Sequence, residues 1–187
     1  MIGYALCGSF CTLGASLCQM KALVEEGYEL QPILSQNAAM TDTRFGKASD
    51  FLAQITTLCQ REPILSIAEA EPLGPARPLE ALVIAPCTGN TLAKLAHGIT
   101  DTAVTMAAKA HLRQSRPLLL TLATNDAMAA NLKNIATLLE KKGVYFVPMR
   151  QDDPRSKPHS LVADFSLLPA CLADALEGKQ RRPLFLT

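Results

Sequence analysis

Short apolar segments alternate along this chain with longer segments in which apolar residues recur at helical spacing. The short segments contain few polar residues, which is typical of strands in a parallel sheet that is covered on both faces. Glycine and proline gather in residues 69–80, which are therefore predicted to form a loop. The predicted strands are 2–7, 30–35, 63–67 (a weak one), 82–85, 118–123 and 144–147, and the predicted helices include 15–26, 45–60, 102–112 and 128–142.

This alternation predicts an α/β fold, a doubly wound and mostly parallel six-stranded sheet of the Rossmann-like kind with helices on both faces. The length of 187 residues favours a single domain, 1–187. Within it, 149–160 is expected to be a mobile loop and 160–187 a C-terminal helix and tail. The segment 102–112 is small and apolar on most sides, which predicts either a buried helix or a contact between copies of the chain.

Composition narrows the class of protein. Hydrophobic residues make up 49% of the chain and charged residues 19%, which is typical of a globular protein. A net charge of +1 without a basic block argues against nucleic acid as a partner, and the apolar runs are far shorter than a membrane span. The N-terminus lacks the features of a signal peptide, and the six cysteines lack zinc-ligand spacing. We therefore expect a cytoplasmic protein with free thiols and no metal site.

The polar loop after the first predicted strand has the position of a ligand site. Ligands of doubly wound sheets bind beyond the carboxyl ends of the strands, where the strand order reverses. This loop, "CGSFCTLGAS" (7–16), offers Gly8 for close backbone approach and the hydroxyls of Ser9 and Thr12 beside a helix start, which suits a phosphate. It lacks the glycine spacing of dinucleotide and Walker motifs. A turn followed by a helix cap explains the loop equally well.

The end of the second predicted strand separates two kinds of cofactor. A nicotinamide dinucleotide fold usually places an acidic residue there for the ribose. This chain has Ser35, Gln36 and Asn37 instead, and neutral donors suit a phosphate oxygen better. The sequence therefore favours FMN over NAD.

Two later strand ends carry further polar side chains. A flat polar ring can lie on the small residues of "PCTGNT" (86–91), although an ordinary helix cap is the alternative for that loop. The strand at 118–123 also ends in polar residues. The expected cofactor contacts here are Pro86, Cys87, Thr88, Asn90, Thr91, Asp101, Thr124 and Asn125.

The stretch "APCTGNTLAKLAHGITD" (85–101) resembles the flavoprotein family of homo-oligomeric FMN-containing cysteine decarboxylases and flavin prenyltransferases. The decarboxylases have Pro-Ala-Ser-Ala-Asn-Thr at this place, and the prenyltransferases have Pro-Cys-Ser. The resemblance covers residues 1–150 and implies a flavoprotein fold, bound FMN and a homo-oligomer, a trimer or larger. Residues 61–85 contain no histidine and the chain contains no tryptophan, so the family's decarboxylation of cysteine substrates is not expected.

Residues 84–113 and 145–164 carry a narrower resemblance within that family, to one component of a two-component enzyme. It implies a role in sporulation, in forming a pyridine dicarboxylate from a hydroxylated tetrahydropyridine dicarboxylate of the lysine pathway. The resemblance implies that the partner component carries out the NADP-dependent dehydrogenation. It also implies that this protein acts in the cytoplasm of the mother cell. Two hypotheses stay open beside it: a non-catalytic component that holds FMN, substrate or partner, and an independent FMN-dependent decarboxylase or prenyltransferase.

A dicarboxylate substrate is expected to contact cationic side chains. Aromatisation of the precursor needs loss of water, which requires a base and an acid, and also loss of a hydride with protons. Arg150, Arg155 and Lys157 follow the sixth predicted strand and are the expected substrate contacts, although an ordinary solvated loop fits the same residues. Cys87 is the candidate catalytic residue, through a thiol pKa lowered by the helix start after it. The alternative for Cys87 is a small contact against the flavin.

Overall fold

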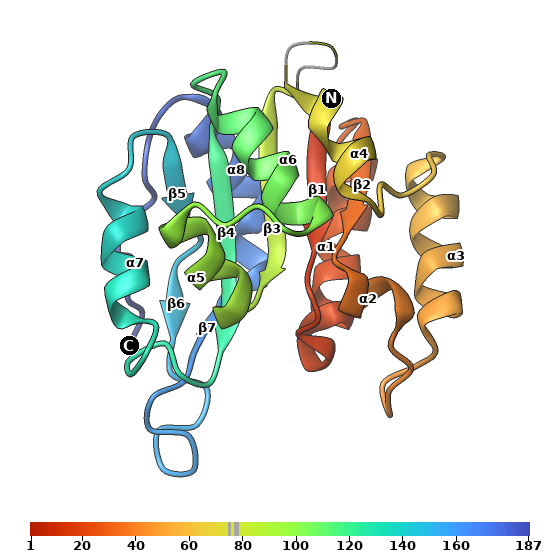
Figure 1. Cartoon of the computed structure of the whole chain (residues 1–187). Helices are drawn as coiled ribbons and strands as arrows, with labels where there is room; N and C mark the ends of the chain where they lie inside the picture. The colour runs from red at the N-terminus through yellow and green to blue at the C-terminus, as the bar shows by residue number, and fades with distance from the viewer. Residues whose placement is uncertain (75, 77–78) are drawn as a thin grey trace.

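The computed structural model describes residues 1–74, 76 and 79–187 and contains a seven-stranded sheet (Figure 1). Five strands are parallel, in the order β2-β1-β3-β4-β5, so the strand order reverses between β1 and β3 as expected. Every residue of β1 and β3 is buried, which explains their unbroken apolar sequences. The parallel strands are β1 Ile2–Leu6, β2 Leu30–Leu34, β3 Ala81–Cys87, β4 Leu118–Thr124 and β5 Val144–Phe146.

Helices cover both faces of the sheet, with α5 and α6 in front of it in Figure 1 and α8 behind it. On one side α1 packs with α3 and α8, and on the other α5 packs with α6 and α7. The predicted fold class is therefore confirmed. Within the described residues the longest helix has 13 residues, fewer than the roughly 20 that cross a bilayer. The helices are α1 Leu13–Glu25, α2 Gln36–Met40, α3 Ala48–Cys59, α4 Ile67–Ala70, α5 Gly89–His97, α6 Ala103–Leu112, α7 Leu132–Leu139 and α8 Leu168–Leu176.

Three strands differ from the sequence prediction. The weak strand at 63–67 is reduced to one parallel bridge, in which Ile64 pairs with Ile33 at the outer edge of β2. The short antiparallel strands β6 (Met149–Arg150) and β7 (Leu161–Ala163) extend the sheet from the end of β4, and they are too short to produce a recognisable pattern.

Two further segments have boundaries that differ from the predicted ones. The loop predicted at 69–80 begins with the end of α4 and the 3₁₀ turn η2 (Glu71–Leu73), and its residues Pro75, Arg77 and Pro78 lie outside the described part of the chain. The helix predicted at 128–142 begins only at Leu132, after a polar turn.

The small-residue helix α6 is buried within the chain itself. Its neighbours are α4, η2 and α5, and most of its side chains are inaccessible. A Cβ placed on Gly74 would lie 3.0 Å from the Ala110 carbonyl oxygen, so backbones approach closely here. Of the two hypotheses for this segment, the structure supports the buried helix.

A buried hydrogen-bond chain joins β1, α1 and the end of β3. The Tyr4 hydroxyl donates to the Ser16 carbonyl oxygen at 2.9 Å. The Ser16 hydroxyl in turn donates to the Ala85 carbonyl oxygen at 2.5 Å. Burial raises the pKa of Tyr4 well above its usual value, so the phenol stays protonated and can donate. These hydrogen bonds hold the start of α1 against the end of β3.

Replacing Ser16 by alanine should lower the free energy of unfolding by about 1–3 kcal/mol, because the buried Ala85 carbonyl loses its donor. Urea unfolding followed by circular dichroism measures the change. Ser49→Ala is the matched control, since Ser49 is exposed on α3 and its loss should change stability by less than about 0.5 kcal/mol. Equal effects of the two substitutions would contradict the assigned role of Ser16.

Candidate functional site

A cavity of about 420 Å³ lies at the carboxyl edge of the sheet, where the strand order reverses. Residues that follow β1, β3 and β4 line it, together with the hairpin between β6 and β7, which projects from the lower edge of the sheet in Figure 1. The lining residues are Gly8, Ser9, Cys11, Thr12, Thr88, Gly89, Asn90, Ala123, Thr124, Asn125, Asp126, Asp152, Lys157 and Val162. The predicted site residues Gly8, Ser9, Thr12, Thr88, Asn90, Thr124, Asn125 and Lys157 are thus brought together.

The loop after β1 presents its hydroxyls at the start of a helix. It forms a 3₁₀ turn, η1 (Phe10–Thr12), that leads directly into α1. The Thr12 hydroxyl lies 2.9 Å from the carbonyl oxygen of Ser9 and 3.0 Å from its hydroxyl, so the two side chains are held beside each other. Helix starts carry a partial positive charge, and this arrangement therefore suits an anion.

The end of β2 touches this loop without lining the cavity. A Cβ placed on Gly8 would lie 3.2 Å from the Asn37 Cβ, so a larger residue at position 8 would press on Asn37. Ser35 is the N-cap of α2, and its hydroxyl accepts a hydrogen bond from the Ala38 N–H at 3.3 Å. Of the two predicted residues, Asn37 adjoins the cavity wall and Ser35 acts as a helix cap.

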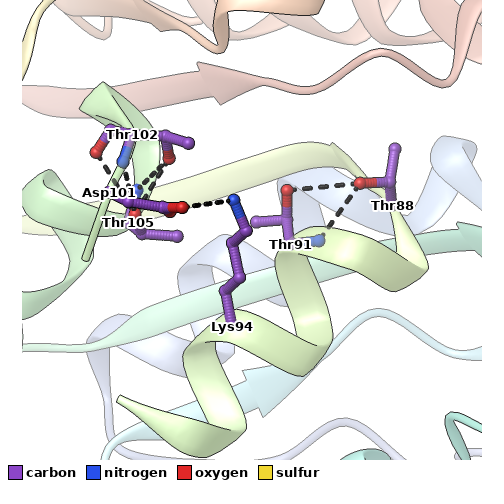
Figure 2. A network of polar contacts seen from close by, with 6 residues as sticks. All are labelled: Thr88, Thr91, Lys94, Asp101, Thr102 and Thr105. Atoms are coloured by element: carbon purple, nitrogen blue, oxygen red, sulfur yellow. Dashed lines mark hydrogen bonds and ion pairs between the residues drawn. The ribbon is translucent and has the colours of Figure 1, made fainter. Parts of the chain in front are cut away.

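The loop after β3 divides into cavity-facing and buried residues. Thr88 lines the cavity and is the N-cap of α5, where its hydroxyl accepts a hydrogen bond from the Thr91 N–H at 3.3 Å (Figure 2). Thr91 is buried and its hydroxyl donates to the Cys7 sulfur at 3.2 Å. Pro86 is buried as well, as the last but one residue of β3. Thr91 and Pro86 therefore support the cavity from behind.

Cys87 does not have the lowered thiol pKa that was expected. The side chain is fully buried at the end of β3, and burial raises its pKa well above the usual value, with Cys7 nearby adding to the shift. Burial likewise raises the pKa of Cys7 to about 11. Loss of water around the thiol outweighs the adjacent helix start, so Cys87 stays a neutral thiol near pH 7.

Asp101 lies outside the cavity, contrary to its expected role as a cofactor contact. Its carboxylate pairs with Lys94 at 2.8 Å, and this interaction lowers the pKa of Asp101 (Figure 2). The N-cap of α6 is Thr102, whose hydroxyl accepts a hydrogen bond from the Thr105 N–H at 3.1 Å. Lys94 and Asp101 thus join the end of α5 to the start of α6.

A polar cluster lies at the loop after β4, where polar side chains were expected, but the sequence did not predict that Asn131 and Asn134 take part in it. The Asp126 carboxylate accepts a hydrogen bond from the Thr124 hydroxyl at 2.5 Å and from the Asn131 amide at 2.9 Å to each oxygen. Buried Asn134 donates to the Asn131 side-chain oxygen at 2.8 Å, which orients the Asn131 amide. The bond from Thr124 holds the pKa of Asp126 below its usual value, so this group is an ionised carboxylate.

The three expected cations are distributed differently around the hairpin. Lys157 lines the cavity and pairs with Asp152 at 2.8 Å, which lowers the pKa of Asp152. Arg150 pairs with Asp164 at 2.6 Å and does not line the cavity. Arg155 is exposed on the hairpin, also outside the lining. The mobility expected of residues 149–160 stays a prediction.

Comparisons with known proteins agree with this architecture. The family model described as Flavoprotein matches residues 2–166. The chain is 45% identical to the B subunit of dipicolinate synthase from Bacillus subtilis (strain 168), over 99% of this chain and 92% of that protein. The crystal structure of the corresponding B subunit from Bacillus halodurans C superposes with a TM-score of 0.91 at 41% identity, over 100% of this chain and 95% of that one. The structure of the FMN-dependent cysteine decarboxylase SpaF shares the fold, with a TM-score of 0.69 at 23% identity, over 93% and 95% of the chains.

Gly89 should be replaceable only at a cost to stability. A Cβ at this position would lie 2.6 Å from the Asn131 amide nitrogen, 2.6 Å from the Thr124 hydroxyl and 2.8 Å from Asp126 Oδ1. We expect Gly89→Ala to lower the free energy of unfolding by about 1–3 kcal/mol, as other overpacking substitutions do. Denaturant unfolding measures the change.

Gly14→Ala is the matched control for that substitution. Gly14 also lies in the first turn of a helix, but a Cβ there would meet nothing within 4 Å. Alanine should therefore raise stability, by at most about 1 kcal/mol, through its higher helix propensity. A Gly89→Ala protein as stable as Gly14→Ala would contradict the close contact with the Asp126 cluster.

Proposed function

The chain belongs to the flavoprotein family, and on this premise we propose that it is the B subunit of a dipicolinate synthase. In this proposal it works with an NADP-dependent dehydrogenase, the A subunit, to form dipicolinate, pyridine-2,6-dicarboxylate, from a hydroxy-tetrahydrodipicolinate during sporulation. The observation that carries the proposal is the likeness to dipicolinate synthase B subunits along nearly the whole chain. The setting would be the cytoplasm of the mother cell, and the six free cysteines are compatible with a reducing compartment.

FMN is the proposed cofactor of the carboxyl-edge cavity. The volume of about 420 Å³ lies within the range of roughly 300–1,000 Å³ that is usual for cofactor sites. The hydroxyls of Ser9 and Thr12 at the start of α1 would hold the phosphate, and Asn37 would support that loop. The Asn90 amide would donate to the polar edge of the ring, beside Thr88, whose hydroxyl already donates to Thr91. The donor set therefore fits a phosphorylated flavin, which when bound supplies the capacity to accept or donate an electron pair.

The dicarboxylate would enter from the side of the hairpin. Among the described residues, Lys157 is the cation that lines the cavity, and its pairing with Asp152 leaves ammonium hydrogens available for a ligand carboxylate. Arg155 shares the hairpin and would approach when the hairpin closes. Arg150 would reach a ligand only after leaving Asp164, so its predicted role as a substrate contact is the weakest of the three.

A second candidate function is a non-catalytic component that holds cofactor or substrate for its partner. Among the described residues that line the cavity there is no histidine, and Cys87 is a buried neutral thiol. Proton transfer by this chain would then depend on the substrate or on the partner. A homo-oligomer remains part of the proposal, and Lys109 of α6 is exposed and Met106 and Leu112 are partly exposed for such a contact.

Reconstitution distinguishes these functions. The dehydrogenase partner, NADP and the tetrahydropyridine precursor are mixed with and without this chain, and dipicolinate is followed by its ultraviolet absorbance. We expect formation to require the chain, and Lys157→Ala to slow it about tenfold or more, since a hydrogen bond to a charged group is lost. Lys133→Ala is the control, because Lys133 is exposed on α7 and outside the cavity lining.

Three outcomes are separable in that experiment. Formation at the same rate without this chain would contradict the proposed function. Formation that needs the chain but not its FMN would favour the non-catalytic, holding role. Equal effects of the two lysine substitutions would remove Lys157 from the proposed substrate contacts.

A further inference from the structure

The cavity has an excess of negative charge, and Asp126 provides it. Three charged side chains line the cavity, Asp126, Asp152 and Lys157. Asp152 and Lys157 neutralise each other through their 2.8 Å ion pair. Within the described part of the chain, the ion pairs do not include Asp126. An unpaired carboxylate is an unexpected feature in a cavity that is proposed to receive a dicarboxylate.

The surrounding side chains hold the Asp126 carboxylate in one orientation. Its Oδ1 accepts hydrogen bonds from the Thr124 hydroxyl and the Asn131 amide, whereas Oδ2 accepts only from Asn131. A carboxylate offers about four acceptor positions, so Oδ2 keeps one position for a further donor. Asn131 and Asn134 are buried, so the amide that donates to the partly exposed Asp126 carboxylate is held in place.

Gly89 allows the Asp126 carboxylate to pack closely against the start of α5 in the cavity wall. Any side chain at position 89 would come within 3.0 Å of Asp126 Oδ1, Thr124 and Asn131. Gly89 and Asp126 both line the cavity, so the closeness of α5 to this cluster brings the carboxylate beside the loop proposed to hold the flavin ring. A ligand in the cavity therefore meets a fixed negative charge on one side and Lys157 of the hairpin on another.

We propose that Asp126 is a positioning residue that accepts a hydrogen bond from a protonated ring nitrogen of the ligand. The inference rests on the proposed function and assigns Asp126 as the residue that contacts the ring nitrogen of its cyclic dicarboxylate substrate. The ligand's positive nitrogen offsets the charge of Asp126, and its carboxylates are left for Lys157 and the hairpin. A ring of the same shape without the N–H donors should bind poorly, because it leaves the fixed carboxylate unpaired.

Two ligands of matched shape test this assignment. Piperidine-2,6-dicarboxylate carries a protonated ring nitrogen at pH 7, and tetrahydropyran-2,6-dicarboxylate has an ether oxygen in its place. Calorimetric titration of the wild-type chain with FMN present should give the piperidine compound about tenfold or greater preference. Asp126→Asn should abolish that preference, and circular dichroism verifies that the variant is folded.

Asp152→Asn is the control, since it removes the other carboxylate of the same cavity. It should change the affinity for both ligands alike and leave the preference intact. Equal binding of both ligands to the wild-type chain would overturn the assignment without any variant, and so would an Asp126→Asn protein that binds both more tightly by the same factor. Failure of the wild-type chain to bind either ligand would overturn the proposed dicarboxylate site itself, and this inference with it.

Discussion

The hydrogen bond from Ser16 to the Ala85 carbonyl is the attachment on which the site depends. It joins the first helix to the end of β3, at the place where the strand order reverses. The loops after β1 and β3 follow neighbouring strands of the sheet. The bond holds α1, which follows β1, against the end of β3. The opening between them follows from the topology, because strands on either side of a reversal send their helices to opposite faces.

The third wall of the cavity has a different origin. It is formed by a polar cluster in which Asp126, Thr124 and two buried asparagines satisfy one another. The two buried asparagines are hydrogen-bonded to each other, since an unpaired buried polar group is costly, whereas partly exposed Asp126 keeps an acceptor position open to the cavity. The glycine that begins α5 completes the arrangement, because the cluster leaves no room for a side chain there. The position of the Asp126 charge in this wall therefore depends on the close packing of Gly89 against the cluster.

The sequence predicted the fold and two of the loops well, because buried parallel strands and helix starts leave local signals. Gly8, Ser9, Thr88 and Asn90 could be placed at one edge from strand order alone. The pKa of Cys87 could not be predicted, since it depends on the elements that cover the thiol. The Asp126 cluster was missed because Asn131 lies in a segment with helical spacing, and hydrogen bonds across a turn leave no periodic signal. Strands β6 and β7 were missed for lack of length.

One phosphorylated flavin is proposed to occupy the space between these loops, and two cysteines on the same stretch of chain can test its presence there. Cys11 and Cys18 are both exposed, but only Cys11 is among the residues that line the cavity. Alkylation by iodoacetamide is followed at each cysteine by mass spectrometry. With FMN about tenfold above its Kd, alkylation of Cys11 should slow about tenfold while Cys18 reacts as before. Unchanged rates at both cysteines under saturating FMN would contradict the account.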